Sequence, residues 1–366
     1  MNSSLAFTSR DAGGPADVQD ATRRLPLADD KAMLRAAAEL TRDLHVARGA
    51  IFWPDMLACV AVGYGALYAA MTAPTGWAIL AGVIAVLALY RAGSFIHELT
   101  HIRQGALPGF RLGWHLLVGI PLMVPSFLYE GVHTLHHARQ RYGTAEDPEY
   151  LPLALMKPWS LPVFVIVAAL APVAQLLRFA VLAPLSAVIP PLRRIVVERY
   201  SALSINPSFR RRAPEGAFRT MWLAQEIATS AWAIALVTLT ATGVIPLRAF
   251  LVFLGVISAV AVLNQIRTLV AHLWENDGEQ MTVTAQYLDS VNVPPPGLLA
   301  PLWAPVGLRY HALHHLVPSV PYHALGVAHR RLMKALGQGS TYDKASYPGL
   351  PGLVARLARS TMVSRG

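Results

Sequence analysis

Long apolar segments alternate with polar, charged segments along this chain, and four of them are long enough to cross a membrane. They cover residues 51–71, 77–92, 221–242 and 247–270, and the second is expected to extend past both of its ends. About 20 residues of helix are needed to cross roughly 30 Å of hydrocarbon. The uncharged loop TAPTG joins the first two segments and the short turn GVIP joins the last two. The pattern therefore predicts two membrane-spanning helical hairpins.

Two further apolar stretches, 112–128 and 161–189, are interrupted by prolines at positions 121 and 125 and at 162, 172 and 184. A proline in a spanning helix frees carbonyl groups that neighbouring groups must satisfy. If the histidine motifs described below form one site, an even number of crossings must separate them. We therefore expect 112–128 to be re-entrant or interfacial, and 161–189 to be an interfacial or hairpin pair.

Composition and charge agree with this layout. The 366 residues are 54% hydrophobic and only 14% charged, and the mean hydropathy is +0.42, which argues against a disordered or ordinary soluble protein. Arginines precede the first hairpin, separate the two hairpins and follow the last one, so the positive-inside rule makes all these segments cytoplasmic. The net charge of +10 is therefore interpreted as binding to a membrane surface, with no nucleic-acid partner.

These observations predict an all-α integral membrane protein with about four transmembrane helices in two hairpins, interfacial helices and a cytosolic histidine-rich cap. We expect a polar cytoplasmic N-terminal arm at residues 1–50, a membrane domain at 51–336 and a C-terminal tail at 337–366. The first fifty residues hold no apolar stretch suited to a signal peptide. A bacterial inner membrane, with both termini and the cap in the cytoplasm, is the expected location.

The chain has a single cysteine, Cys59, so a bound metal ion must be held by His, Asp or Glu. Nine of the 13 histidines fall into the motifs HELTH, HTLHH and HALHH or stand alone between them. Spacings of three and four residues put side chains on one helical face. More imidazoles are present than one ion can accept, so two ions are the natural number. The candidate metal-binding and catalytic residues are His97, His101, His133, His136, His137, His272, His311, His314 and His315.

This arrangement resembles the membrane fatty-acid desaturase and hydroxylase superfamily, whose mark is HxxxH, HxxHH and a late HxxHH around a non-haem di-iron centre. The resemblance covers residues 52–336, and His272 matches the family's extra histidine before the third box. It implies four spanning helices under a cytosolic cap, two iron ions, molecular oxygen as co-substrate and electrons from a separate protein. One detail differs, because Thr268 stands where some desaturases have an asparagine that holds a metal-bound water.

The resulting interpretation is an oxygen-dependent di-iron desaturase that introduces a double bond into a lipid acyl chain. The alternative is a hydroxylase or ketolase of a lipid, carotenoid or alkane with the same di-iron site. The lone cysteine excludes a fused ferredoxin domain and the N-terminal arm is too short for a fused cytochrome. We therefore expect a separate electron donor of the ferredoxin, rubredoxin or cytochrome b5 type, with its reductase.

Two other classes of protein explain less of the pattern. HELTH also matches the zinc-protease signature HExxH, and with Asp277 as third ligand it would make an intramembrane metalloprotease, but HTLHH and HALHH would then be unexplained. A metal transporter or sensor would need charged groups at the middle of its spans, where this chain has few.

Acidic side chains are expected to orient the ligand histidines from behind. Glu98, which lies inside HELTH, is the favoured candidate. The others are Glu130, Asp147, Glu275 and Asp277. Four histidines fit no motif and are interpreted as structural or surface residues: His45, His115, His323 and His329.

Overall fold

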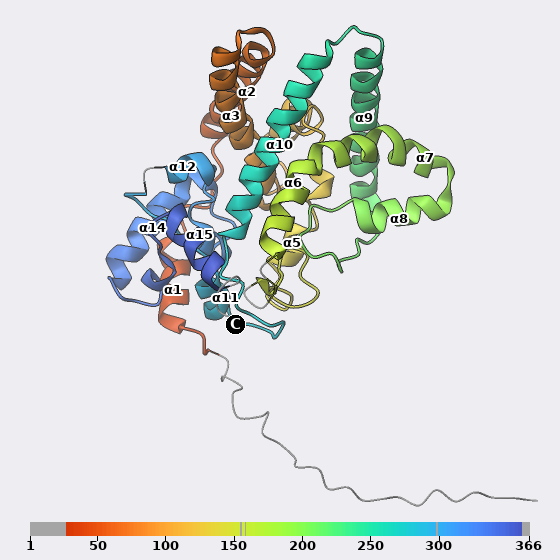
Figure 1. The fold of residues 1–366 in the computed structure, drawn as a ribbon. Coiled ribbons are helices and arrows are strands. Elements are labelled where there is room, and N and C mark those ends of the chain that lie inside the picture. The colour runs from red at the N-terminus through yellow and green to blue at the C-terminus, as the bar shows by residue number, and fades with distance from the viewer. Residues whose placement is uncertain (1–26, 154–155, 158, 298, 361–366) are drawn as a thin grey trace, which may run out of the picture.

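The computed structural model describes residues 27–153, 156–157, 159–297 and 299–360. Its described residues form helices, turns and three isolated β-bridges, without a regular strand. Long helices stand side by side in one half of the molecule, and short helices gather in a cap at their lower end (Figure 1). The predicted all-α class with a cap is confirmed.

The first predicted hairpin consists of α2 (Gly49–Thr72) and α3 (Thr75–His101). Gly63 allows the two helices to approach closely, because a Cβ atom at this position would lie 2.6 Å from a methyl group of Leu89. The second hairpin consists of α9 (Gly216–Ala241) and α10 (Leu247–Leu269). All four helices are long and apolar enough to cross a membrane, and α3 extends past both ends of its predicted segment.

A fifth apolar helix runs from Ser160 to Val188. The sequence instead predicts an interfacial or hairpin pair of segments over 161–189. The helix consists of α6 (Ser160–Leu177), the π-helical turn η4 (Arg178–Leu182) and α7 (Ala183–Val188). The chain then reverses into α8 (Pro190–Tyr200), so that α7 and α8 lie as a pair beside α9 (Figure 1). The structure therefore has five helices of spanning length in its described part, and the number of actual crossings stays a prediction.

Hydrogen bonds show that this segment returns to the side from which it started. The guanidinium of Arg178 donates to the Tyr200 carbonyl at 2.9 Å, and the Ile205 N–H donates to the Pro148 carbonyl at 3.1 Å. Arg178 also pairs with Glu226 of α9 at 2.5 Å. This return agrees with the even number of membrane crossings that must separate the histidine motifs if they form one site.

The stretch 112–128 forms no long helix. It contains α4 (Phe110–Trp114), the π-helical turn η1 (His115–Gly119) and the short η2 (Ser126–Leu128). An ion pair between Arg111 and Glu130 closes its two ends, so the chain enters and leaves this stretch at the same place. The re-entrant or interfacial interpretation fits this geometry.

The cap is built from short helices and the loops between them. Its elements are α1 (Lys31–Leu40), α5 (His133–His136), α11 (Val283–Asp289), α12 (Ala300–Trp303), α13 (His311–Leu316), α14 (Tyr322–Leu336), η5 (Asp343–Ala345) and α15 (Leu350–Ala358). Met33 and Ala37 of α1 share an apolar core with Leu325 of α14, and Leu353 of α15 packs with Val270 beyond α10. Parts of the expected arm and tail thus contribute to the cap.

Candidate metal centre

The length of α3 delivers the first histidine motif to the cap. Its 27 residues extend about 40 Å at roughly 1.5 Å per residue, which is longer than the hydrocarbon layer. His97 and His101 lie in the last two turns, one helical turn apart, and their rings face the same side with centroids 5.0 Å apart. The apolar helix therefore ends in a pair of imidazoles.

The second and third motifs form two short helices, α5 and α13. In each motif the first and fifth residues lie on one face, and their ring nitrogens approach closely. The Nε2 atoms of His133 and His137 are 3.0 Å apart, and those of His311 and His315 are 3.2 Å apart. The expected convergence of imidazoles within each motif is thus present.

A tight turn after α10 presents His272. Trp274 adopts a left-handed backbone conformation with φ of 61°, which is uncommon for a bulky residue, and its indole N–H donates to the Leu269 carbonyl at 2.8 Å. His272 forms a backbone bridge with Ser290. The turn directs His272 toward the third motif, where its Nε2 lies 3.0 Å from that of His311.

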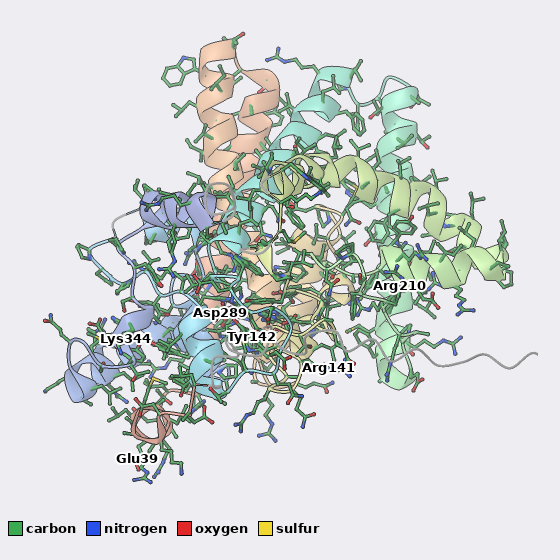
Figure 2. The ribbon with its side chains drawn as sticks, turned by 60° about the horizontal axis from the view of Figure 1, so that its bottom comes forward. Glu39, Arg141, Tyr142, Arg210, Asp289 and Lys344 are labelled. Carbon is green, nitrogen blue, oxygen red and sulfur yellow. The ribbon has the colours of Figure 1, made fainter. Side chains whose placement is uncertain are left out.

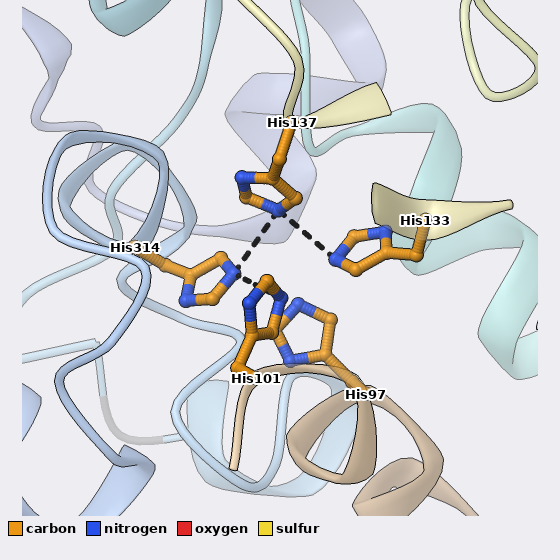
Figure 3. Close-up of side chains that lie close together, drawn as sticks. All are labelled: His97, His101, His133, His137 and His314. Atoms are coloured by element: carbon orange, nitrogen blue, oxygen red, sulfur yellow. Dashed lines mark hydrogen bonds between the residues drawn. The ribbon is translucent and has the colours of Figure 1, made fainter. Parts of the chain in front are cut away.

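The nine histidines divide into two clusters in which the ligand atoms lie within 4.8 Å of one another. The five-histidine cluster contains His97, His101, His133, His137 and His314, whose rings converge in Figure 3. The four-histidine cluster contains His136, His272, His311 and His315. Both short helices supply both clusters, so the two clusters are interleaved in the sequence.

The donor set fits two metal ions. Within the five-histidine cluster, Nε2 of His314 lies 3.1 Å from that of His101 and 3.2 Å from that of His137. Two nitrogens bound at right angles to one ion, with bonds of roughly 2.1 Å, would be about 3.0 Å apart. Facing nitrogens that carry lone pairs have no proton to share, and a cation held between them would supply the missing attraction.

Burial keeps most of these imidazoles neutral, as metal binding requires. Desolvation lowers the pKa of His137, His311, His314 and His315 well below the ordinary value, and neighbouring histidines lower it further. His136 differs. Burial lowers its pKa, but the carboxylates of Asp147, Glu149 and Asp289 together outweigh this and raise it overall.

Acidic and phenolic groups fix the orientation of three of the rings from behind. Nδ1 of His136 lies 2.9 Å from Asp147, and Nδ1 of His133 lies 2.9 Å from Glu149 and 2.8 Å from the Tyr129 hydroxyl. A histidine that donates from Nδ1 keeps the lone pair on Nε2, which is the nitrogen that faces the cluster. These carboxylates therefore select the tautomer that can bind a metal ion.

A tyrosine hydroxyl lies between His272 and the carboxylate of Asp289 and hydrogen-bonds to both. The Tyr142 hydroxyl lies 2.8 Å from Nδ1 of His272 and donates to Asp289 at 2.8 Å. Figure 2 shows Tyr142 and Asp289 close together near the middle of the view, with Glu39 and Lys344 farther out in the cap. Burial raises the pKa of Asp289 to about 6 and that of Glu149 to about 7.

Of the carboxylates expected behind the ligands, Asp147 contacts a ring directly and is fully buried. Glu98 is also buried, with Oε1 3.7 Å from Nδ1 of His97. Glu130 instead pairs with Arg111 and accepts from Ser126, and Glu275 pairs with Arg356 at the surface. Asp277 is exposed and lies outside both clusters, so the zinc-protease interpretation lacks its third ligand.

Sequence reasoning missed Glu149 and Asp289. Glu149 could have been found, because it follows Asp147 by two residues in a DPE run just after HTLHH. Asp289 lies 17 residues beyond His272 and offers no comparable signal. The four remaining histidines lie outside both clusters and contact ordinary polar groups: Ser319 for His45, Ser126 and Gln225 for His115, the Arg48 N–H for His323 and Tyr342 for His329.

With this geometry, comparison with known proteins identifies the family. The fatty acid desaturase family matches residues 74–346. The chain belongs to this family. A curated relative, a ceramide hydroxylase of Caulobacter vibrioides, is 51% identical over 324 residues, which cover 88% of this chain and 92% of the relative. Fatty acid desaturase family members are non-haem di-iron oxidoreductases, so the family agrees with the two histidine clusters.

Proposed function

We propose that this protein is an oxygen-dependent hydroxylase of ceramide, with one iron ion at each histidine cluster. The observation that carries the proposal is the 51% identity to a ceramide hydroxylase over most of both chains. The histidine pattern alone predicts desaturation, with hydroxylation as the alternative. The relative supports the alternative better, and desaturation stays an unconfirmed prediction.

The iron ions would supply the oxidant for an unactivated C–H bond, using molecular oxygen and two electrons from a separate donor. One oxygen atom enters the lipid as a hydroxyl group, and the other leaves as water with two protons. A ferredoxin, rubredoxin or cytochrome b5 type protein with its reductase could deliver these electrons.

The protein's own residues hold and insulate this centre. Six of the nine histidines are buried and the other three are half-buried, so their nitrogens are preorganised and shielded from bulk water. Asp147, Glu149 and Tyr142 fix three rings through their Nδ1 atoms. Their negative charge or hydrogen-bonding capacity also helps offset the positive charge of two metal ions.

Hydroxylation and desaturation differ in where the substrate carbon is held after the first hydrogen is removed. The same centre can return oxygen to that carbon or remove a second hydrogen from its neighbour. The histidine pattern is common to both reactions, so the residues around the lipid must decide between them.

Orientation completes the proposal. The cap lies at one end of the long helices, and the turns between α2 and α3 and between α9 and α10 lie at the other (Figure 1). We assign the cap and both termini to the cytoplasm of a bacterial inner-membrane protein, where soluble electron donors can reach it.

The test is expression in a bacterial host that contains ceramide, with lipid mass spectrometry of the extracted ceramides. The intact chain should produce ceramide with one added oxygen atom, and His314→Ala should produce none and bind less iron. His45→Ala is the matched control, because His45 is exposed and lies outside both clusters. Ceramide that has lost two hydrogens would restore the desaturase interpretation, and unchanged ceramide with an iron-loaded protein and active donor would exclude this substrate.

A further inference from the structure

The chain forms an uncharged loop just before the third histidine motif. Residues 291–308 contain five prolines and no charged side chain. The Val293 N–H donates to the Arg309 carbonyl at 2.7 Å, and the Arg309 guanidinium donates to the Val293 carbonyl at 2.7 Å. These hydrogen bonds close the base of the loop two residues before His311, and α12 lies within it.

The loop places α12 against the spanning helices. α12 contacts both α3 and α10, and the Tyr90 hydroxyl of α3 donates to the Trp303 carbonyl at 3.0 Å. Figure 1 shows α12 at the top of the cap, next to the long helices. The outer face of α12 is therefore continuous with the surface that α3 and α10 present to lipid.

This outer face is apolar. Leu299 and Leu302 are 68% and 48% exposed, and Pro301 between them is exposed as well. On the opposite side, Ala300 and Trp303 are buried in a core that α15 shares. A group of exposed apolar side chains in one uncharged segment indicates an interaction site.

The contact with Tyr90 gives the depth of α12 in the membrane. At roughly 1.5 Å per residue, Tyr90 lies about 22 Å along α3 from Thr75, which begins α3 at the end opposite the cap. The hydrocarbon layer is about 30 Å thick, so this contact lies roughly 8 Å inside its edge nearer the cap. Arg91, the first charged residue of α3, follows Tyr90 and pairs with Asp55 of α2 at 2.5 Å, as expected where polar groups begin.

We propose that α12 anchors the cap in the bilayer by inserting Leu299 and Leu302 among the acyl chains of the leaflet next to the cap. Helices that lie in the interface bury their apolar face about 5–10 Å deep, which matches the depth of Tyr90. The loop can enter this region without desolvating a charge, because residues 291–308 have none.

The bilayer is favoured over a second protein as the partner of this face. The face lies at hydrocarbon depth and continues the lipid-facing surface of α3 and α10. Because the base of the loop is two residues from His311, the anchor also sets the distance between the third histidine motif and the membrane surface. The inference does not depend on which lipid is oxidised.

The experiment attaches the fluorophore NBD to single cysteines of the full chain in a Cys59→Ala background, in vesicles of phosphatidylcholine and phosphatidylglycerol. Leu302→Cys is the test position. Ile227→Cys is the matched control inside the membrane, because Ile227 is 68% exposed on α9 and lies about 21 Å from Ala241 at the end opposite the cap. Lys344→Cys is the control in water, on the cap surface.

Nitroxide groups on the lipid acyl chains should quench the label at position 302 as strongly as the label at 227, and severalfold more strongly than the label at 344. Iodide in the water should quench the label at 344 and leave the other two largely unquenched. Leu299→Cys should behave like Leu302→Cys, and it provides the same test if Leu302→Cys does not fold.

Two results would overturn the inference. Iodide quenching at positions 299 and 302 as strong as that at 344 would show that α12 faces water. Weak nitroxide quenching, together with a disulfide-linked dimer of Leu302→Cys after mild oxidation at a high ratio of lipid to protein, would assign the face to a second copy of the chain. Neither readout requires lipid oxidation, so this inference and the proposed function fail independently.

Discussion

Tyr322 and Glu98 are separated by 224 residues, and the backbone N–H of Tyr322 donates to the Glu98 carboxylate at 3.0 Å. The Tyr322 hydroxyl also donates to Asp55 of α2 at 2.8 Å. One residue at the start of α14 thus joins the cap to both helices of the first hairpin. Because Glu98 lies within HELTH, this connection also fixes the first histidine motif beside the third.

Glu98→Ala should destabilise the protein by about 1–3 kcal/mol, because it leaves the part-buried N–H of Tyr322 without its acceptor. Glu98→Gln keeps an acceptor oxygen and should cost less. Thermal or denaturant unfolding in detergent measures the difference. A metalloprotease would instead need Glu98 as its general base, so retained lipid oxidation by Glu98→Gln would argue further against that interpretation.

Asp147→Asn should weaken metal binding about 10–100-fold, because it removes the charge that orients His136. The measurement is iron content after dialysis against a graded series of iron concentrations. Glu146→Gln is the matched control, since this neighbouring carboxylate is exposed and makes only a surface contact with Arg141. Equal iron binding by the two variants would show that Asp147 is not needed to orient its ring.

His115 should make the stability of the protein fall in mild acid. Burial, aided by Arg111, lowers its pKa to about 4 in the folded protein, whereas an unfolded histidine has a pKa near 6.5. The unfolded state therefore takes up the proton first, and stability is lost as the pH falls from about 6.5 toward 4. Between pH 7 and pH 5, the titration of His115 should lower the free energy of unfolding by about 2 kcal/mol.

His115→Gln removes this titration and can still contact Gln225 and Ser126. The unfolding midpoint of this variant should therefore fall less between pH 7 and 5 than that of the wild type. The comparison isolates His115, because the cluster histidines are the same in both proteins. Parallel pH profiles would show that His115 is protonated alike in the folded and unfolded states.

Cysteine labelling tests the orientation in the membrane. In a Cys59→Ala background, Thr75→Cys and Val244→Cys should react with an impermeant maleimide from outside. Both residues are exposed: Thr75 begins α3 directly after the α2–α3 turn, and Val244 lies in the α9–α10 turn. These turns lie opposite the cap (Figure 1). Lys344→Cys, which lies on the cap surface, should react only after the membrane is opened. The reverse pattern would place the histidine clusters outside the cytoplasm.

Sequence patterns predicted the two hairpins and the nine converging histidines because both depend on local spacing. Apolar length defines α2, α3, α9 and α10, and helical periodicity aligns the imidazoles within each motif. The division into clusters of five and four could not be read from the sequence. It depends on how α5 and α13 face each other across the cap, which is set by tertiary packing.

The carboxylates near His272 likewise could not be predicted from sequence spacing, because tertiary packing decides which of them reaches the histidine. Glu275 and Asp277 are near His272 in the sequence, but the left-handed turn at Trp274 leads the chain away to the surface. Asp289 returns from α11 and reaches His272 through Tyr142. The continuous helix from Ser160 to Val188, with the π-helical turn η4 inside it, could not be predicted either, because the apolar composition of 161–189 is the same in one helix and in a hairpin pair.

The interleaving of the two clusters has a consequence for assembly of the enzyme. α5 and the residue that follows it supply His133 and His137 to one cluster and His136 to the other. α13 supplies His314 to the first cluster and His311 and His315 to the second. An ion at either cluster would immobilise both short helices and so complete the neighbouring cluster. Loading should therefore be cooperative, with empty and doubly filled protein in equilibrium and little of the singly filled form.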